Sequence, residues 1–340
     1  MKTTIIVGAG ASAELGLPTG GELKDLIIDS LSQQTRDRRT TFTGDKQILE
    51  AFHALSRSEP GYNRVLEYTR TAQELTNALH LAPSIDNYLH THAQDARVQV
   101  CGKLAIASCI LAAERNSKLG SKTRFAPSLD RMGDTWIGAL FGLLAEAGSL
   151  DSFVSRLERI RFIVFNYDRC LEHFLHSALQ VYFKCTEVEA TEAMAVLDVC
   201  HPYGTVGSLS WQGSGPGVNF GGIEYWESLW NVAIQVRTFT EQVESETRDL
   251  LKRMVEDAGQ LIFLGFAFHD LNIDLICPDQ DNKVNRRIYA SAFGISEPNS
   301  KQIVKMLDDR GFALDRNTTL ETGLKAEPLI RAYSRYLGLA

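Results

Sequence analysis

The chain has 340 residues, of which 44% are hydrophobic and 23% charged, as in ordinary globular proteins long enough for one large domain or two small ones. Its formal net charge of −7 argues against a surface built to hold nucleic acid, because phosphate binding depends on Lys and Arg. The six cysteines form no C-x-x-C pair, which excludes a zinc ribbon and favours reduced thiols in a cytoplasmic protein. No apolar run reaches the roughly 18 residues of a membrane span, so we expect no membrane segment. Because the cysteines form no C-x-x-C pair, we also expect no metal.

The first apolar run ends in a glycine turn. Ile5-Ile6-Val7 predicts a buried strand that enters a tight turn at Gly8-Ala9-Gly10, and residues 11–15 predict the start of a helix. Glycines let a backbone approach a diphosphate, and a helix start offers unpaired N–H groups. The spacing departs from G-x-G-x-x-G, because Gly16 is the next glycine. The turn therefore indicates either nucleotide binding or a strand-to-helix turn without a ligand.

A polar stretch and a long helical block follow. Gln33 to Thr43 is polar and carries three arginines, so we expect a loop there. Apolar residues at helical spacing predict helices through most of 46–120. Ser84 is a candidate N-cap, which places Asp86 in the first turn of a helix. The helix dipole favours a carboxylate there, so Asp86 has a structural explanation beside any role in binding a ligand.

Three further apolar runs predict strands that end in polar residues or glycine. They are residues 160–165, which lead into Asn166-Tyr167-Asp168, residues 196–200, which lead into His201, and residues 260–264, which lead into Gly265-Phe266. Open α/β sheets bind ligands outside the carboxyl ends of their strands. These strand ends are therefore the candidate site.

The alternation of strands and helices predicts an α/β fold, a Rossmann-like doubly wound parallel sheet with a large helical insertion. We expect residues 1–45 and 150–295 to form the nucleotide-binding core and residues 46–149 to form the insertion. We expect residues 296–340 to form a C-terminal helical segment packed on the core. A polar linker is expected at 120–128.

Asn166 and Asp168 lie two residues apart, so both point to one ligand if the strand continues through them. The chain has no Gly-x-Ser-x-Gly elbow, which leaves nucleophilic hydrolase chemistry unsupported. A neutral histidine as base, with an amide that holds a water or a ligand, suits a bond whose leaving group departs readily, such as the N-glycosidic bond of NAD. Structural explanations remain open: Ser12 or Asn166 as a helix cap, Asp168 as a first-turn acid, and His201 as a core histidine.

The order of these motifs resembles that of the sirtuins. The matching segments are Gly8-Ala9-Gly10-Ala11-Ser12 with Gly16-Leu17-Pro18, Asn166-Tyr167-Asp168 with Leu171-Glu172, His201-Pro202-Tyr203-Gly204, and Leu264-Gly265-Phe266. Ser84-Ile85-Asp86 is similar to a segment of bacterial sirtuin-like defence proteins. The resemblance covers most of residues 1–280. It implies catalytic roles for Asn166, His201 and Asp168, and NAD contacts from Gly8, Ala9, Gly10, Ser12, Asp86, Gly265 and Phe266.

Two departures indicate the branch of the family. Sirtuin deacylases carry Phe-Arg after the G-I-P element and usually a four-cysteine zinc ribbon, whereas Thr19-Gly20-Gly21 follows Pro18 here. What remains is similar to bacterial enzymes that hydrolyse NAD to nicotinamide and ADP-ribose in abortive-infection anti-phage defence. The alternatives are a catalytically silent NAD/ADP-ribose-binding regulatory module and an NAD-dependent protein deacylase.

The resemblance also implies an assembly. Sirtuin-like defence proteins are commonly oligomeric, so we expect a homo-oligomer. Control is expected from a partner chain such as a HerA-type ATPase or an Argonaute-like protein, and nucleic acid would be met only through that partner.

Overall fold

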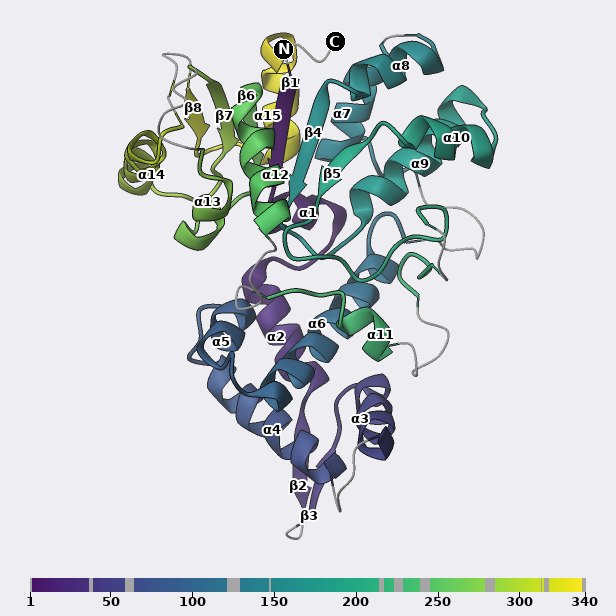
Figure 1. The fold of residues 1–340 in the computed structure, drawn as a ribbon, viewed down its shortest axis with the longest axis vertical. Coiled ribbons are helices and arrows are strands. Elements are labelled where there is room, and N and C mark those ends of the chain that lie inside the picture. The colour runs from purple at the N-terminus through teal and green to yellow at the C-terminus, as the bar shows by residue number, and fades with distance from the viewer. Residues whose placement is uncertain are drawn as a thin grey trace.

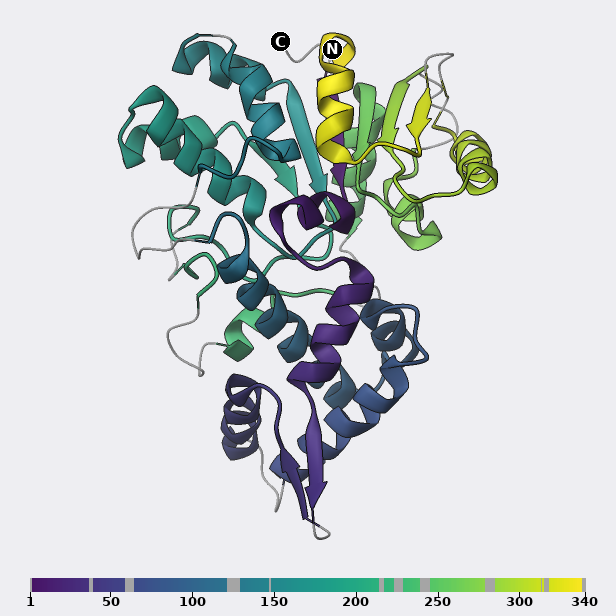
Figure 2. The same ribbon diagram turned by 180° about the vertical axis from the view of Figure 1, so that it is seen from behind.

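The computed structural model describes residues 2–337 except 37–38, 59–63, 121–128, 147, 214–216, 223–228, 239–244, 279–284, 313 and 315–317. An α/β part holds both ends of the chain, and a helical part lies beneath it (Figures 1 and 2). Most of the expected polar linker at 120–128 falls outside the described residues.

The α/β part is built on a six-stranded parallel sheet with the order β5-β4-β1-β6-β7-β8. Its strands are β1 Lys2–Val7, β4 Ile160–Val164, β5 Asp198–Cys200, β6 Ala258–Leu264, β7 Arg287–Ser291 and β8 Thr319–Glu321. The strands β4 and β5 lie on one side of β1, and the later strands β6, β7 and β8 lie on the other. This order has its topological switch point between β1 and β6. The predicted fold class, a Rossmann-like sheet with a helical insertion, is confirmed.

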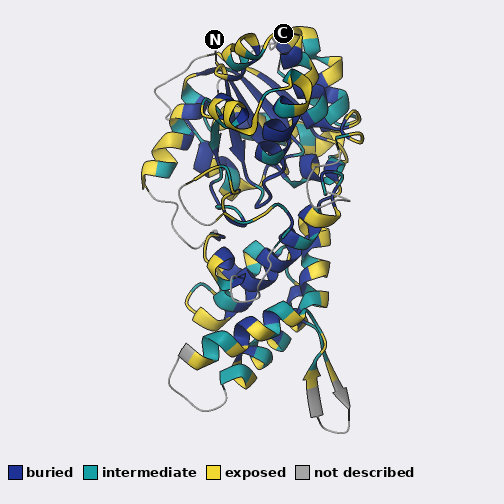
Figure 3. Cartoon of the chain, turned by 90° about the vertical axis from the view of Figure 1, so that its right-hand side faces the viewer, coloured by how far each residue is buried: buried dark blue, intermediate teal, exposed yellow. Residues whose placement is uncertain are grey.

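Helices cover both faces of the sheet because successive side chains of a strand point to opposite faces. Ile6 of β1 belongs to one apolar core, whereas its neighbours Ile5 and Val7 belong to the other. On the face of Ile6 pack α12 Ser245–Glu256, α13 Asp270–Ile276 and α14 Glu297–Asp309. On the opposite face pack α7 Trp136–Ala145, α8 Leu150–Leu157, α9 Cys170–Phe183, α10 Glu187–Met194, α15 Ala326–Ala332 and α16 Ser334–Leu337. Figure 3 shows the inner strands of the sheet buried between these layers.

The helical part surrounds α6, Ala96–Asn116. Its other helices are α2 Gly20–Ser30, α3 Lys46–Ser58, α4 Arg64–Leu79, α5 Ile85–Thr91 and α11 Leu229–Ala233. Within the described residues α6 alone is long and apolar enough to cross a membrane, but 67% of its most apolar window is buried in this structure. A buried core helix passes the same test of length and composition, and most buried residues of α6 belong to the same core as Ile6.

Several elements differ from the sequence-based expectations. The polar stretch after α2 was expected to be a loop, but it forms the antiparallel strands β2 Gln33–Arg36 and β3 Arg39–Phe42. Phe42 anchors this hairpin by packing edge-on against Phe52 of α3, with ring centroids 6.1 Å apart. The helix α7 lies in the range expected for the insertion, but it packs on the sheet against α15. The helix α2 lies in the range expected for the core, but it packs on α6. The three-residue strand β8 was not predicted.

Candidate active site at the carboxyl edge of the sheet

The carboxyl ends of the strands point toward the helical part (Figure 1), and the glycine turn lies there at the switch point. After β1 the chain forms α1, Ala9–Ser12, and a 3-10 turn over Ala13–Leu15. The N–H of Gly8 donates to the carbonyl of Leu264 and the N–H of Gly10 to that of Gly265, both at 2.9 Å. The expectation that the turn leaves its N–H groups unpaired is therefore wrong for these two residues.

Close packing of the two turns explains their glycines. A Cβ on Gly8 would lie 2.6 Å from the carbonyl oxygen of Gly265, and a Cβ on Gly10 would lie 2.9 Å from the same atom. Gly265 has a φ of +56°, which favours glycine, and Phe268 holds the same value at the end of this turn. Strained backbone of this kind clusters at functional sites. Phe266 is buried against Phe165, so its side chain belongs to the core and only its backbone faces the turn.

Ser12 connects two of the predicted catalytic residues. Its hydroxyl donates to Asp168 Oδ2 at 2.8 Å, and its oxygen accepts from Asn166 Nδ2 at 2.7 Å. The strand β4 ends at Val164, so strand alternation does not align Asn166 with Asp168; the shared contact with Ser12 does. Ser12 caps no helix, whereas Asp168 also accepts the N–H of Cys170 at 3.1 Å at the start of α9.

This chain of hydrogen bonds determines how the Asn166 amide is turned. A carboxylate only accepts, so Ser12 gives its proton to Asp168 and must accept from the NH₂ group of Asn166. The Asn166 oxygen Oδ1 then lies away from Ser12, and among the described residues no group donates to it. Ser12 and Asp168 are buried, and Asn166 is half-buried. The site thus presents one oriented acceptor beside the switch point.

His201 lies directly after β5 and behind Asn166. Its Nδ1 is 3.0 Å from the backbone oxygen of Asn166, and its Nε2 is 2.8 Å from Glu172 Oε1. Its side chain is only 9% exposed and that of Glu172 only 3%. Burial opposes the charge of each group, but their mutual attraction raises the pKa of His201 and lowers the pKa of Glu172. Both shifts favour an imidazolium paired with a carboxylate.

Asp86 joins the helical part to the same edge of the sheet. Ser84 caps α5 by accepting the N–H of Asn87 at 3.2 Å, and Asp86 lies in the first turn, as predicted. The hydroxyl of Tyr167, between Asn166 and Asp168, donates to Asp86 Oδ1 at 2.7 Å. Burial raises the pKa of Asp86, and the Tyr167 hydrogen bond opposes that shift.

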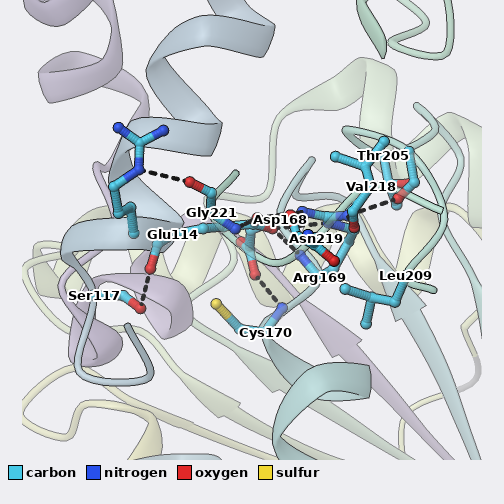
Figure 4. Close-up of polar contacts among 12 residues, drawn as sticks. Glu114, Ser117, Asp168, Arg169, Cys170, Thr205, Leu209, Val218, Asn219 and Gly221 are labelled. Atoms are coloured by element: carbon cyan, nitrogen blue, oxygen red, sulfur yellow. Dashed lines mark hydrogen bonds and ion pairs between the residues drawn. The ribbon is translucent and has the colours of Figure 1, made fainter. Parts of the chain in front are cut away.

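A buried ion pair supports this strand end, and sequence reasoning missed it. Arg169 is 1% exposed and Glu114, at the end of α6, is fully buried. Glu114 accepts from the Arg169 side chain and from the N–H groups of Arg169 and Gly221. The guanidinium also donates to the carbonyls of Gly207, Val218 and Asn219 (Figure 4). The pair thereby ties Gly207, Val218, Asn219 and Gly221 to the residues that follow Asp168. The signal available in the sequence was Glu114 itself, a glutamate at the end of a strongly apolar helix.

The structure places the remaining features apart from this site. Within the described residues no three His, Cys, Asp or Glu side chains gather closely enough to hold a metal ion. A cavity of about 800 Å³ lies between α4 and the start of α6 and shares no residue with the strand ends. The predicted catalytic roles and NAD contacts all stay predictions: Asn166, His201 and Asp168 for catalysis, and Gly8, Ala9, Gly10, Ser12, Asp86, Gly265 and Phe266 for NAD.

No family model and no curated protein matches the chain. Among solved structures, the chain is similar to a triple mutant of a Sir2 homologue in complex with 2′-O-acetyl ADP ribose. The two are 14% identical, the alignment covers 99% of this chain and 93% of that one, and the TM-score is 0.37. At this identity and score the likeness says nothing about the ligand or the activity of this chain.

Proposed function

We propose that the chain hydrolyses NAD⁺ to nicotinamide and ADP-ribose at the carboxyl edge of its sheet. The observation that supports this most is the hydrogen-bonded chain Asp168–Ser12–Asn166, which holds an oriented amide beside the switch point. The order of motifs that resembles the sirtuins lies on the same strand ends. The Rossmann-like sheet supplies the position where such folds bind nucleotides.

Once NAD⁺ is bound in place, the hydrolysis requires few catalytic groups from the protein. The C1′–N bond of NAD⁺ breaks with both electrons going to the pyridinium nitrogen, which leaves as neutral nicotinamide. The oxygen of a water bonds to C1′, and the proton of that water passes to solvent. Asn166 Oδ1 accepts a hydrogen bond from the water and orients it, and the amide takes no proton itself. The rate therefore depends on positioning more than on a strong base.

The biological role belongs to the same proposal. We propose an effector of abortive anti-phage defence, controlled by a partner chain such as a HerA-type ATPase. The support for this part is the resemblance of the motifs alone.

One assay distinguishes the three hypotheses for the site, which are a hydrolase, a deacylase and a silent binding module. It measures release of nicotinamide from NAD⁺ by the purified chain, with and without an acyl-lysine peptide. We expect release without peptide. Release that requires the peptide would indicate a deacylase. Binding of ADP-ribose in calorimetry without any release would indicate a silent binding module.

A further inference from the structure

The environment of His201 conflicts with the role of a base. A base needs a nitrogen lone pair that faces the substrate or a water. Both ring nitrogens of His201 instead face acceptors, the backbone oxygen of Asn166 and the carboxylate of Glu172, at 3.0 and 2.8 Å. An acceptor on each side requires an N–H on each side, and a neutral imidazole has only one. With Glu172 ionised, as its lowered pKa favours, this geometry calls for the protonated ring.

The carboxylate keeps the ring in this state. Glu172 is buried, and its second oxygen, Oε2, has no hydrogen-bond partner among the described residues. The carboxylate therefore depends on His201 for its main compensating contact, because a buried charge without a partner is strongly unfavourable. Other titratable or charged groups lie around the pair: Asp168 and Arg169 from the turn after β4, Cys170 of α9, Glu114 of α6 and Cys200 of β5. Asp168 adds to the attraction for the ring proton, and Arg169 adds to the attraction for the carboxylate.

We propose that His201 is a positioning residue held as a cation by Glu172, and that it fixes the backbone of Asn166 without taking a proton from substrate or water. The inference rests on the proposed hydrolysis of NAD⁺, and it assigns Glu172 a function in it. The chain of contacts runs from Glu172 through His201 to the Asn166 carbonyl. The side chain of Asn166 then presents Oδ1 at the carboxyl edge of the sheet.

The direction of the pH dependence separates the two roles. The folded pKa of His201 is raised, so a positioning cation supports activity below that pKa and loses it as the pH rises through it. Above that pKa the one remaining ring proton is drawn to Glu172, and the bond to Asn166 is lost. A base would behave in the opposite way, because its activity would appear only as the pH rises.

A matched pair of double variants tests the role at the level of a single hydrogen bond. In both, Glu172→Gln removes the carboxylate. His201→Asn keeps an N–H donor near the place of Nδ1, and His201→Ala removes it. We expect the Asn variant to retain activity within about tenfold of the wild type without an alkaline loss, and the Ala variant to be at least about tenfold lower than the Asn variant. Equal inactivity of two folded variants would indicate a base and overturn the proposal.

Nitrogen-15 NMR of the histidine rings in the wild-type chain gives a measurement that needs neither activity nor a variant. The His201 signals are assigned by their absence in His201→Asn. We expect both ring nitrogens to be protonated at pH 7.5. An unprotonated nitrogen at that pH would overturn the proposal. Doubly protonated nitrogens in a chain that releases no nicotinamide would leave the pair in place and contradict the proposed hydrolysis alone.

Discussion

At the scale of single residues, Gly265 is a position that cannot accept a side chain without a shift of the backbone. A Cβ there would lie 1.9 Å from the backbone nitrogen of Ala11, and the residue has a φ of +56°. Gly265→Ala should therefore lower the free energy of unfolding by about 3 kcal/mol or more, because backbone must move. Urea unfolding measures the loss. Gly294→Ala is the control, since its φ of +82° is also left-handed but its Cβ would meet nothing within 4 Å. Equal losses in both variants would contradict the close approach of the two turns.

His173 makes a second prediction at this scale. Its ring stacks on Phe220, with centroids 4.0 Å apart, and burial, aided by Arg169, lowers its pKa to about 4. The unfolded chain, with a pKa of about 6.5, binds the proton more readily, so stability is lost as the pH falls from 6.5 toward 4.

Between pH 7 and pH 5 His173 should account for about 2 kcal/mol of lost stability, and His173→Gln should remove most of that loss. Urea unfolding at the two pH values measures it. His53→Gln, at an exposed histidine of α3, serves as the control. An unchanged loss in His173→Gln would show that its ring is not held neutral by burial.

At the scale of elements, the Glu114–Arg169 pair connects α6, the start of α9 and residues 218–221. Arg169→Met removes the donors to Gly207, Val218 and Asn219 and leaves Glu114 buried without its partner. We expect a loss of about 3 kcal/mol and rapid proteolysis within 207–221. Arg70→Met, which breaks an exposed pair with Glu74, should change neither. Resistance of the Arg169 variant to protease would contradict this role.

The same scale shows what periodicity can and cannot predict. The strands β1, β4 and β6 each contain a run of apolar residues, mostly β-branched or aromatic in β1 and β4, and a parallel sheet buried on both faces produces that pattern. The strand β8 has three half-buried residues at the sheet edge, so its pattern was too short to recognise. The hairpin of β2 and β3 is polar, and it packs on α3 through the contact of Phe42 with Phe52. The spacing of apolar residues does not predict that contact.

Within the site, sequence predicted which strand ends meet but not the contacts between them. Ser12, Asn166, Asp168 and His201 do gather at one edge, because parallel strands bring their carboxyl ends together. The partners of His201 and Arg169 lie on other elements, 29 and 55 residues away along the chain. Local pattern holds no signal for such pairs, and the glycine turn was assigned free N–H groups that the turn after β6 in fact uses.

At the scale of the whole molecule, the helical part contacts the carboxyl edge of the sheet through Asp86 and Glu114. An unrestrained NAD⁺ hydrolase would deplete its own host, so we expect activity to depend on assembly. Closed symmetric oligomers are the common state of self-associating chains. Light scattering should therefore show a homo-oligomer, and nicotinamide release per chain should rise with protein concentration. A monomer with concentration-independent activity would contradict this form of control and leave the site assignment unaffected.

The central claim is that Asn166 orients the water that attacks NAD⁺. Nicotinamide release by Asn166→Ala, compared with the wild type and with Asn299→Ala at an exposed position of α14, tests it most directly. We expect the Asn166 variant to fall at least about 100-fold in kcat while it still binds ADP-ribose and unfolds near the wild-type temperature, since a half-buried amide adds little to the core. The Asn299 variant should keep wild-type activity. Full nicotinamide release by a folded Asn166→Ala chain would contradict the account.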